Sequence, residues 1–191
     1  MSAGTAVWSV AARTAGAEET RALAARLAPL CRPGDVILLA GGLGAGKTTF
    51  AQGLARGLGV SGPVTSPTFT LVRHYRCAGP RVTTLLHADV YRLDTLGEVA
   101  DLGLAELAEE DAVAVVEWGE AAAPVLGDSA LVVSLTPEVP EAPEVSGTPV
   151  APDAAAPGSH EVRLVTLAGR GPGWVARAAE VQAAVGELAA R

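Results

Sequence analysis

The sequence predicts an α/β fold, a single domain in which a mixed, mostly parallel sheet is flanked by helices. Short apolar runs typical of buried strands, at Val36–Ala40 and 112–116, alternate with stretches of helical periodicity. Two segments rich in β-branched and aromatic residues, 69–76 and 81–87, are joined by a Gly-Pro turn and predict an antiparallel hairpin. Because 191 residues suffice for one well-buried domain and are few for two, we expect one domain over residues 1–191.

The composition excludes wholesale disorder, since 49% of the residues are hydrophobic and the net charge is only −7. The apolar run Val36–Ala40 is far shorter than the roughly 20 residues that cross a bilayer, so we expect no membrane span. No basic residue precedes Arg13, which makes the N-terminus a poor signal peptide. Cys31 and Cys77 lack metal-ligand spacing, which favours buried or neutral thiols in a reducing compartment. We therefore expect a cytoplasmic protein.

The charge balance argues against autonomous binding of nucleic acid. The chain holds 14 basic and 21 acidic residues, and Lys47 is its only lysine. No run of Lys and Arg could neutralise several phosphates at once. We therefore expect no binding to DNA, and contact with RNA only through a partner that supplies the positive surface.

The part of the chain before the hairpin is expected to hold two strands and two helices. These are a strand at 5–10, a helix at 17–30, a buried strand at Val36–Ala40 and a helix from about Lys47. Glu18 and Glu19 favour the N-terminal end of the first helix because they complement its dipole. Gly59 suits the C-terminal end of the second helix.

The part after the hairpin predicts further strands, a low-complexity loop and a closing helix. The elements are a helix at 95–107 interrupted at Gly103, strands at 112–116, 131–136 and 161–167, and a helix from Trp174. Residues 137–159 are rich in Pro, Ala and acids and show no periodicity. We expect a loosely extended surface loop there, either a long hairpin connection or a binding segment.

A glycine-rich segment joins the buried strand Val36–Ala40 to the helix that follows it. Its residues match the pattern G-x-x-x-x-G-K-[ST]: Gly41, Gly42, Leu43, Gly44, Ala45, Gly46, Lys47 and Thr48. Glycines let successive backbone N–H groups point inward around a phosphate, and the helix adds the positive end of its dipole. Lys47 can reach the β- and γ-phosphates of a nucleotide, and the Thr48 hydroxyl can ligate Mg²⁺. The segment predicts a P-loop NTPase domain.

Two carboxylates end predicted strands at the edge where open α/β sheets bind their ligands. They are Asp89, after the strand that closes the hairpin, and Glu117, after the strand at 112–116. Each could ligate Mg²⁺ directly or through water, orient an attacking water, or only cap the next turn. His87 points to the same side of its strand as Asp89 and is either structural or catalytic.

The segment Ser66-Pro67-Thr68 lies between the phosphate-loop helix and the hairpin. In nucleotide switches, a segment at this place brings a threonine to the γ-phosphate. The residues are equally consistent with a turn that leads into a strand.

Four sequence blocks, in this order and at these distances, resemble the bacterial TsaE (YjeE) family. They are GGLGAGKTTF, VTSPTFTLV, HADVYRL and VVEWGE, and the match covers about residues 16–120. Members of that family are small ATPases of the pathway that forms the N6-threonylcarbamoyl group on adenosine 37 of tRNA. The resemblance implies a P-loop ATPase that serves this modification.

The resemblance also implies roles for individual residues. ATP and Mg²⁺ would bind in the loop at 41–49, which adds Thr49 to the motif, with Thr48 and Glu117 as metal contacts. Asp89 would act near the nucleotide, at the metal or at a water molecule. Three further positions match: Thr68 the family's switch-like threonine, Trp118 the tryptophan beside the acidic residue, and Gly16 the segment that approaches the adenine. The candidate catalytic residues are therefore Lys47, Thr68, Asp89 and Glu117.

The partners that the resemblance implies are the TsaB and TsaD proteins, and TsaD carries the transferase site. TsaE proteins act on that complex, so tRNA would be reached only through it, in agreement with the acidic charge. The chain departs from the family at Gly42, where an acidic residue is usual, and in the length of the loop at 137–159. Since the anchoring glycines are intact, we expect nucleotide binding to survive the first departure.

Other activities remain consistent with a P-loop domain of this size. A small-molecule kinase would need an arginine-rich lid, for which Arg73, Arg76 and Arg81 on the predicted hairpin are candidates. A nucleotide-dependent interaction module would bind ATP with little turnover. A GTPase is excluded, because the guanine-selecting motif N/T-K-x-D requires a lysine outside the phosphate loop and the chain has none.

Overall fold

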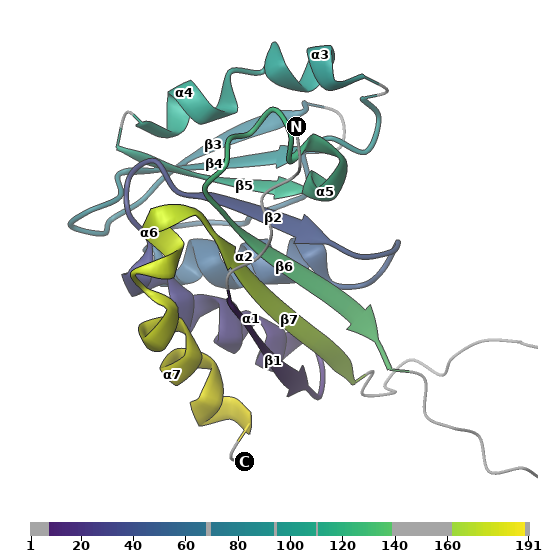
Figure 1. Cartoon of the computed structure of the whole chain (residues 1–191), viewed down its shortest axis with the longest axis vertical. Coiled ribbons are helices and arrows are strands. Elements are labelled where there is room, and N and C mark those ends of the chain that lie inside the picture. The colour runs from purple at the N-terminus through teal and green to yellow at the C-terminus, as the bar shows by residue number, and fades with distance from the viewer. Residues whose placement is uncertain (1–7, 68–69, 94, 110, 139–161, 190–191) are drawn as a thin grey trace, which may run out of the picture.

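The computed structural model describes residues 8–67, 70–93, 95–109, 111–138 and 162–189, which form one seven-stranded sheet with helices on both faces (Figure 1). The strands are β1 (Trp8–Thr14), β2 (Val36–Ala40), β3 (Val72–Arg76), β4 (Thr84–Asp89), β5 (Ala112–Glu117), β6 (Ala130–Pro137) and β7 (Arg163–Arg170). Their order across the sheet is β1-β7-β6-β2-β5-β4-β3. The four strands β6, β2, β5 and β4 run parallel to their neighbours in this group, and the other pairings are antiparallel. The mixed sheet predicted from the sequence is confirmed.

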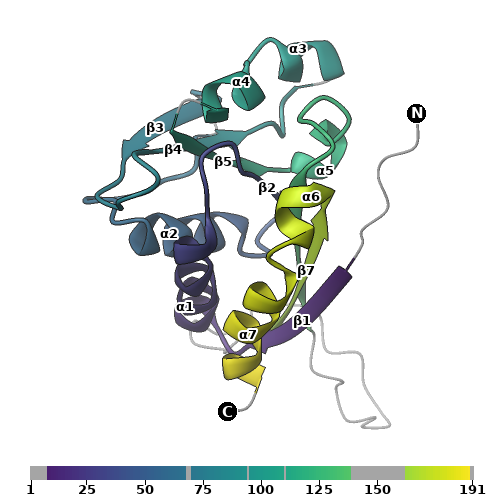
Figure 2. The same ribbon diagram turned by 60° about the vertical axis from the view of Figure 1, so that its left-hand side comes forward.

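The helices form two layers (Figure 2). They are α1 (Ala17–Leu27) with a 3-10 turn at Ala28–Leu30, α2 (Lys47–Gly57), α3 (Leu96–Ala100), α4 (Leu104–Glu109), α5 (Gly119–Ala122), α6 (Gly171–Val175) and α7 (Ala178–Ala189). Apolar side chains of α1, α2 and α7 form one core cluster with the sheet, and those of α3, α4 and α5 form a second one. No helix in the described ranges is long and apolar enough to cross a membrane.

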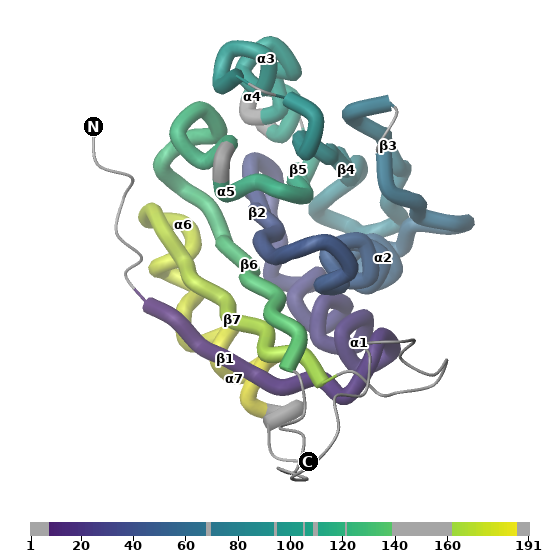
Figure 3. The backbone as a smooth tube through the Cα atoms, turned by 90° about the vertical axis from the view of Figure 1, so that its right-hand side faces the viewer, coloured from purple at the N-terminus to yellow at the C-terminus, as the bar shows by residue number. Residues whose placement is uncertain are grey.

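The central strands are buried on both faces. Every residue of β2 and of β5 is buried, which accounts for their continuous apolar runs. Strand β2 lies between β5 and β6, so the loop that leaves its carboxyl end emerges in the middle of the sheet (Figure 3). This is where parallel α/β sheets place their ligands.

Tertiary pairing moves the bounds of several predicted elements. The first strand runs from Trp8 to Thr14 and not over 5–10, because its whole length pairs with β7; residues 5–7 lie outside the described ones. The predicted helix at 17–30 leaves the α-helical conformation at Leu27, since Pro29 has no N–H to donate.

The predicted loop at 137–159 also begins later than expected. Pro137 is the last residue of β6 and pairs with Arg163, and the Glu138 N–H donates to the Val162 carbonyl at 2.8 Å. The ladder therefore extends to the start of the low-complexity segment. Residues 139–161, which hold the rest of that predicted loop, lie outside the described part of the chain.

Helices α1 and α2 approach each other at a glycine, and a stability test follows from it. A Cβ atom at Gly53 would lie 2.3 Å from the carbonyl oxygen of Arg21 and 2.6 Å from its Cα. We expect Gly53→Ala to lower the free energy of unfolding by about 1–3 kcal/mol in urea denaturation, because the two backbones must separate.

Gly186 in α7 provides the matched control, because a Cβ there meets nothing within 4 Å. Gly186→Ala is expected to raise stability by about 0.5–1 kcal/mol, the ordinary helix preference for alanine. Equal effects of the two substitutions would contradict the close approach of α1 and α2.

Candidate functional site

The phosphate-binding loop connects β2 to α2 and is shaped by glycines. Gly41, Gly44 and Gly46 have φ angles of 131°, 76° and 106°, in the region that side chains disfavour. A Cβ at Gly41 would also lie 2.4 Å from the backbone oxygen of Leu135 in β6. Position 41 therefore requires glycine for two reasons: its positive φ angle and its close packing against β6.

Lys47, the first residue of α2, is buried with only 5% of its surface exposed. Its Nζ donates to the carbonyl oxygens of Gly41 and Gly42, each at 2.8 Å, and lies 3.7 Å from the centre of the Trp118 ring. Burial lowers the pKa of Lys47, while the negative charges of Glu117 and Asp89 oppose this effect. The ammonium group thus lies inside the curl of the loop, where a phosphate would meet it.

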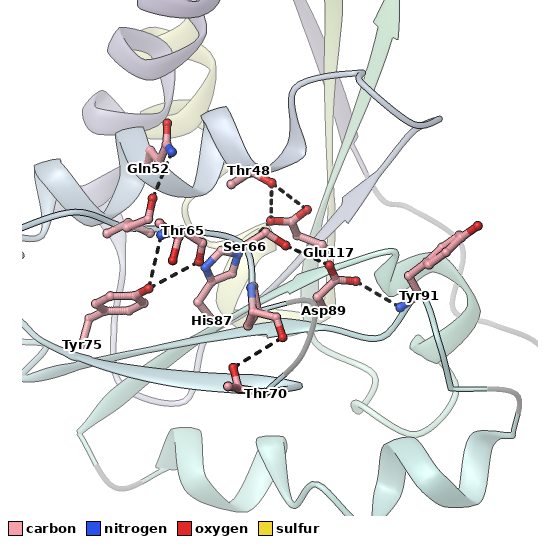
Figure 4. Close-up of polar contacts among 12 residues, drawn as sticks. Thr48, Gln52, Thr65, Ser66, Thr70, Tyr75, His87, Asp89, Tyr91 and Glu117 are labelled. Carbon is pink, nitrogen blue, oxygen red and sulfur yellow. Dashed lines mark hydrogen bonds and ion pairs between the residues drawn. The ribbon is translucent and has the colours of Figure 1, made fainter.

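Thr48 and Glu117 are brought together from separate elements (Figure 4). The Thr48 hydroxyl at the start of α2 donates to the Glu117 carboxylate at the end of β5, 2.8 Å from Oε1 and 3.0 Å from Oε2. The same Oε1 lies 2.9 Å from Nε2 of His87 in β4. The structure thus brings together two residues that the family resemblance named as metal contacts, and their role at a metal stays a prediction.

Asp89 ends β4 and lies opposite Glu117 in the β4–β5 register. It is 6% exposed, and its two oxygens accept from the Ser66 hydroxyl at 3.1 Å and from the Tyr91 N–H at 3.1 Å (Figure 4). The N–H contact is an ordinary turn cap, one of the roles considered for this residue. The Ser66 contact joins Asp89 to the segment Ser66-Pro67-Thr68, for which a switch and a turn into a strand were both considered.

These residues line one cleft of about 370 Å³. Its lining consists of Leu43, Gly44, Gly46, Lys47, Thr48, Thr49, Ser66, Asp89, Tyr91, Arg92, Glu117 and Trp118. The Tyr91 and Trp118 rings lie 4.9 Å apart beside it, and Leu43 at the loop tip is 94% exposed. A larger hollow of about 870 Å³ lies along β1 and α1 but contains none of the phosphate-loop residues. The smaller cleft is the candidate nucleotide site because it holds the loop and the carboxylates.

Two predicted groups of site residues lie away from the cleft, and one further predicted residue is not described. Gly16 caps α1 and is not among the residues that line the cleft, so its role at the adenine stays a prediction. Thr68 lies outside the described residues. Arg73 and Arg76 are exposed on β3, the strand at the sheet edge, Arg81 is exposed between β3 and β4, and none of the three lines the cleft.

The structure adds residues to which the sequence assigned no role at the site. Tyr91 and Arg92 line the cleft. Both belong to the block HADVYRL, and this membership is the one sequence feature that could have placed them at the site. Arg163, at the start of β7, donates from Nε to the Ala45 carbonyl at 3.1 Å and lies against Gly46. No sequence pattern near Arg163 predicts this contact, because Arg163 and Ala45 are 118 residues apart in the sequence.

The donor set of the cleft fits Mg²⁺. The Thr48 hydroxyl and the Glu117 carboxylate meet beside the loop, and the Asp89 carboxylate ends the adjacent strand. These are hard oxygen donors, and Mg²⁺ typically takes one or two protein carboxylates together with phosphates and waters. No group of three or more His, Cys, Asp or Glu residues that could hold a metal ion occurs among the residues described.

Comparison with known proteins decides the family. The family model for "Threonylcarbamoyl adenosine biosynthesis protein TsaE" matches residues 14–142, more than half of the chain. The chain belongs to the TsaE family. This family acts in tRNA threonylcarbamoyladenosine biosynthesis. The resemblance inferred from the four sequence blocks is confirmed.

Individual TsaE proteins resemble the chain over most of its length. The Streptomyces coelicolor tRNA threonylcarbamoyladenosine biosynthesis protein TsaE is 41% identical over 155 residues, 81% of this chain and 93% of the relative. The Mycobacterium tuberculosis protein of the same name is 46% identical over 62% of this chain and 73% of its own length. The crystal structure of Bacillus subtilis YdiB superimposes with a TM-score of 0.66 at 30% identity, covering 91% of this chain and 94% of the other. The shared fold therefore extends beyond the segment that the TsaE family model matches.

Proposed function

We propose that this TsaE protein is a Mg²⁺-dependent ATPase required for N6-threonylcarbamoylation of adenosine 37 in tRNA. The observation that carries the proposal is the contact between Thr48 and Glu117 beside the phosphate loop. Thr48 supplies the hydroxyl that follows the loop lysine, and Glu117 supplies an acid at the end of a strand. These are the two kinds of protein group that hold Mg²⁺ in P-loop NTPases.

The loop and its lysine bind the phosphates in this proposal. Backbone N–H groups of the loop at 41–46 surround the β-phosphate, and the N-terminus of α2 adds its positive dipole. Lys47 exchanges its bonds to the Gly41 and Gly42 carbonyls for bonds to the β- and γ-phosphates. Because Lys47 is almost fully buried, its charge acts on the phosphates with little screening by water.

The carboxylates complete the reaction centre. Thr48 and Glu117 would hold Mg²⁺, which neutralises charge on the β- and γ-phosphate oxygens. Asp89 lies on the adjacent strand end, where its carboxylate orients the attacking water or a ligand water. Ser66 holds one Asp89 oxygen, so this segment fixes the direction in which the carboxylate points. Thr68, two residues further on, is the proposed γ-phosphate sensor.

The proposed partners are the TsaB and TsaD proteins, with tRNA contacted through their complex. The chain has 21 acidic and 14 basic residues, and this negative net charge supports contact with tRNA through partner proteins, since it disfavours direct binding of phosphates. The proposed location is the cytoplasm. A small-molecule kinase is disfavoured because the arginines expected for its lid, Arg73, Arg76 and Arg81, do not line the cleft.

Turnover of ATP tests the proposal. We expect slow phosphate release from the purified protein and a clear rise when the TsaB–TsaD pair is added. An interaction module would show ATP binding without such a rise. Brisk turnover that ignores the pair would instead favour a kinase-like enzyme and contradict the proposed role.

Glu117→Gln tests the metal site. Loss of the charge is expected to lower ATP turnover by about 10- to 100-fold, because the ion loses a ligand. ATP binding measured by calorimetry in EDTA should be retained, since the loop and Lys47 are unchanged. Glu180→Gln is the matched control, because Glu180 is an exposed acid on α7 and does not line the cleft. Unchanged turnover in Glu117→Gln would move the acidic role to Asp89.

A further inference from the structure

His87 lies fully buried beneath the carboxylate that the proposed metal site uses. Its side chain is 0% exposed, and its Nε2 lies 2.9 Å from Oε1 of Glu117 (Figure 4). The two residues belong to the neighbouring parallel strands β4 and β5, where His87 is opposite Val115 and Glu117 is opposite Asp89. The contact is thus set by the register of two central strands.

The other ring nitrogen of His87 indicates which atom carries the proton. Nδ1 is buried and has no hydrogen-bond partner among the residues that the structure describes. A buried N–H without an acceptor costs about 1–3 kcal/mol and is rarer in proteins than a buried acceptor without a donor. The favoured tautomer therefore carries its hydrogen on Nε2, and Nε2 donates to Glu117.

This bond divides the Glu117 carboxylate into two unequal oxygens. Among the residues that the structure describes, Oε1 accepts from both His87 and Thr48, whereas Oε2 accepts only from Thr48, at 3.0 Å. The Thr48 hydroxyl must turn a lone pair toward a metal ion in order to ligate it. Among the contacts described, the His87 bond is the one to Glu117 that comes from outside the proposed metal ligands, so it holds Oε1 whichever way the Thr48 O–H turns and leaves Oε2 for the ion or its water.

We propose that His87 is a positioning residue that orients the Glu117 carboxylate through its Nε2–H and thereby sets the affinity of the ATP-loaded site for a divalent cation. The inference rests on the proposed function, because it assigns a second residue to the same metal site. Carboxylates that ligate metals are themselves hydrogen-bonded, and loss of such a partner typically costs 10- to 100-fold in metal affinity.

Two substitutions separate positioning from simple packing. His87→Leu fills the space without a donor, whereas His87→Gln places an amide N–H at the same number of bonds from Cα as Nε2. We expect His87→Leu to weaken Mn²⁺ binding to the ATP-loaded protein by about 10- to 100-fold in electron paramagnetic resonance titrations, and His87→Gln to restore most of it. ATP affinity in EDTA should stay within about twofold in both. His74→Leu, at an exposed histidine on β3, is the matched control and should change neither quantity.

Nitrogen-15 NMR of the imidazole, without nucleotide or metal, gives a readout that does not depend on the ATPase. We expect His87 to show a protonated Nε2 and an unprotonated Nδ1, and Glu117→Ala to shift the Nε2–H proton signal. An Nε2 without a proton would overturn the inference, as would wild-type Mn²⁺ affinity in His87→Leu. Equal weakening in both variants would show that packing alone matters and would also overturn it. No Mn²⁺ binding by the wild-type protein with ATP would instead overturn the proposed function, and the role of His87 with it.

Discussion

Lys47→Ala is expected to lower the affinity for ATP by about 10- to 100-fold. A hydrogen bond to a charged group contributes about 1.5–3 kcal/mol, and each 1.4 kcal/mol is tenfold in affinity. Lys47 is the only lysine of the chain and its Nζ lies within the loop, so no neighbouring ammonium group can replace it. Calorimetric titration with ATP, and separately with ADP and AMP, measures the loss. AMP should be affected least, because it lacks the phosphates that Lys47 contacts.

Arg56→Ala is the control for this prediction. Arg56 lies exposed near the end of the same helix, so its removal changes the net charge equally without touching the loop. We expect ATP affinity to be unchanged in Arg56→Ala. Wild-type affinity in Lys47→Ala would overturn the assignment of the loop as the phosphate site. Thermal unfolding of both variants shows whether the fold is retained, since Lys47 also bonds to the Gly41 and Gly42 carbonyls.

Arg177→Met is expected to cause a large loss of stability. Arg177 is 2% exposed, and its two terminal nitrogens pair with the two oxygens of Asp35, each at 2.6 Å. It also donates to the carbonyls of Leu30 and Gly173 and lies 3.9 Å above the Trp174 ring. Removing one partner of a buried pair leaves the other charge uncompensated, at a cost of about 3–5 kcal/mol. For a chain of this size, the melting temperature should fall by about 6–20 °C.

An exposed ion pair provides the control for Arg177→Met. Arg13 pairs with Glu138 at 3.0 Å, but its side chain is 72% exposed, and we expect Arg13→Met to leave the melting temperature nearly unchanged. Combining Arg177→Met with Asp35→Asn should cost less than the sum of the single changes, because the second substitution removes the unpaired charge. Additive effects, or a small loss in Arg177→Met, would contradict the coupling of the turn before α7 to Asp35, the residue that precedes β2.

The phosphate loop and the acids opposite it were predictable because each depends on short-range pattern. The run Val36–Ala40 reads as a buried strand, the glycines read as a phosphate turn, and α2 begins at Lys47 as predicted. Asp89 and Glu117 were expected at one edge because the carboxyl ends of parallel strands meet there, and the register pairs them.

The role of His87 could not be read from the chain. The alternation of the strand indicates only that it shares a side with Asp89, and a slip of one residue in the β4–β5 register would turn it to the other face. Its position under Oε1 of Glu117 follows from the packing of two central strands. The same holds for the Tyr91 and Trp118 rings, which come from the ends of these strands and lie 4.9 Å apart.

The amino-acid pattern alone was thus sufficient for the fold class, the family and the place of the glycine-rich loop between β2 and α2, since local propensity, burial period and turn residues all agree there. The packed sheet was needed to place Arg163 on the loop and Arg177 on Asp35, contacts that span 118 and 142 residues. Contacts between residues so far apart in the sequence produce no periodic pattern from which they could be predicted. They arise only when β7 inserts between β1 and β6, and this order is set by the burial of whole strands and not by any short segment.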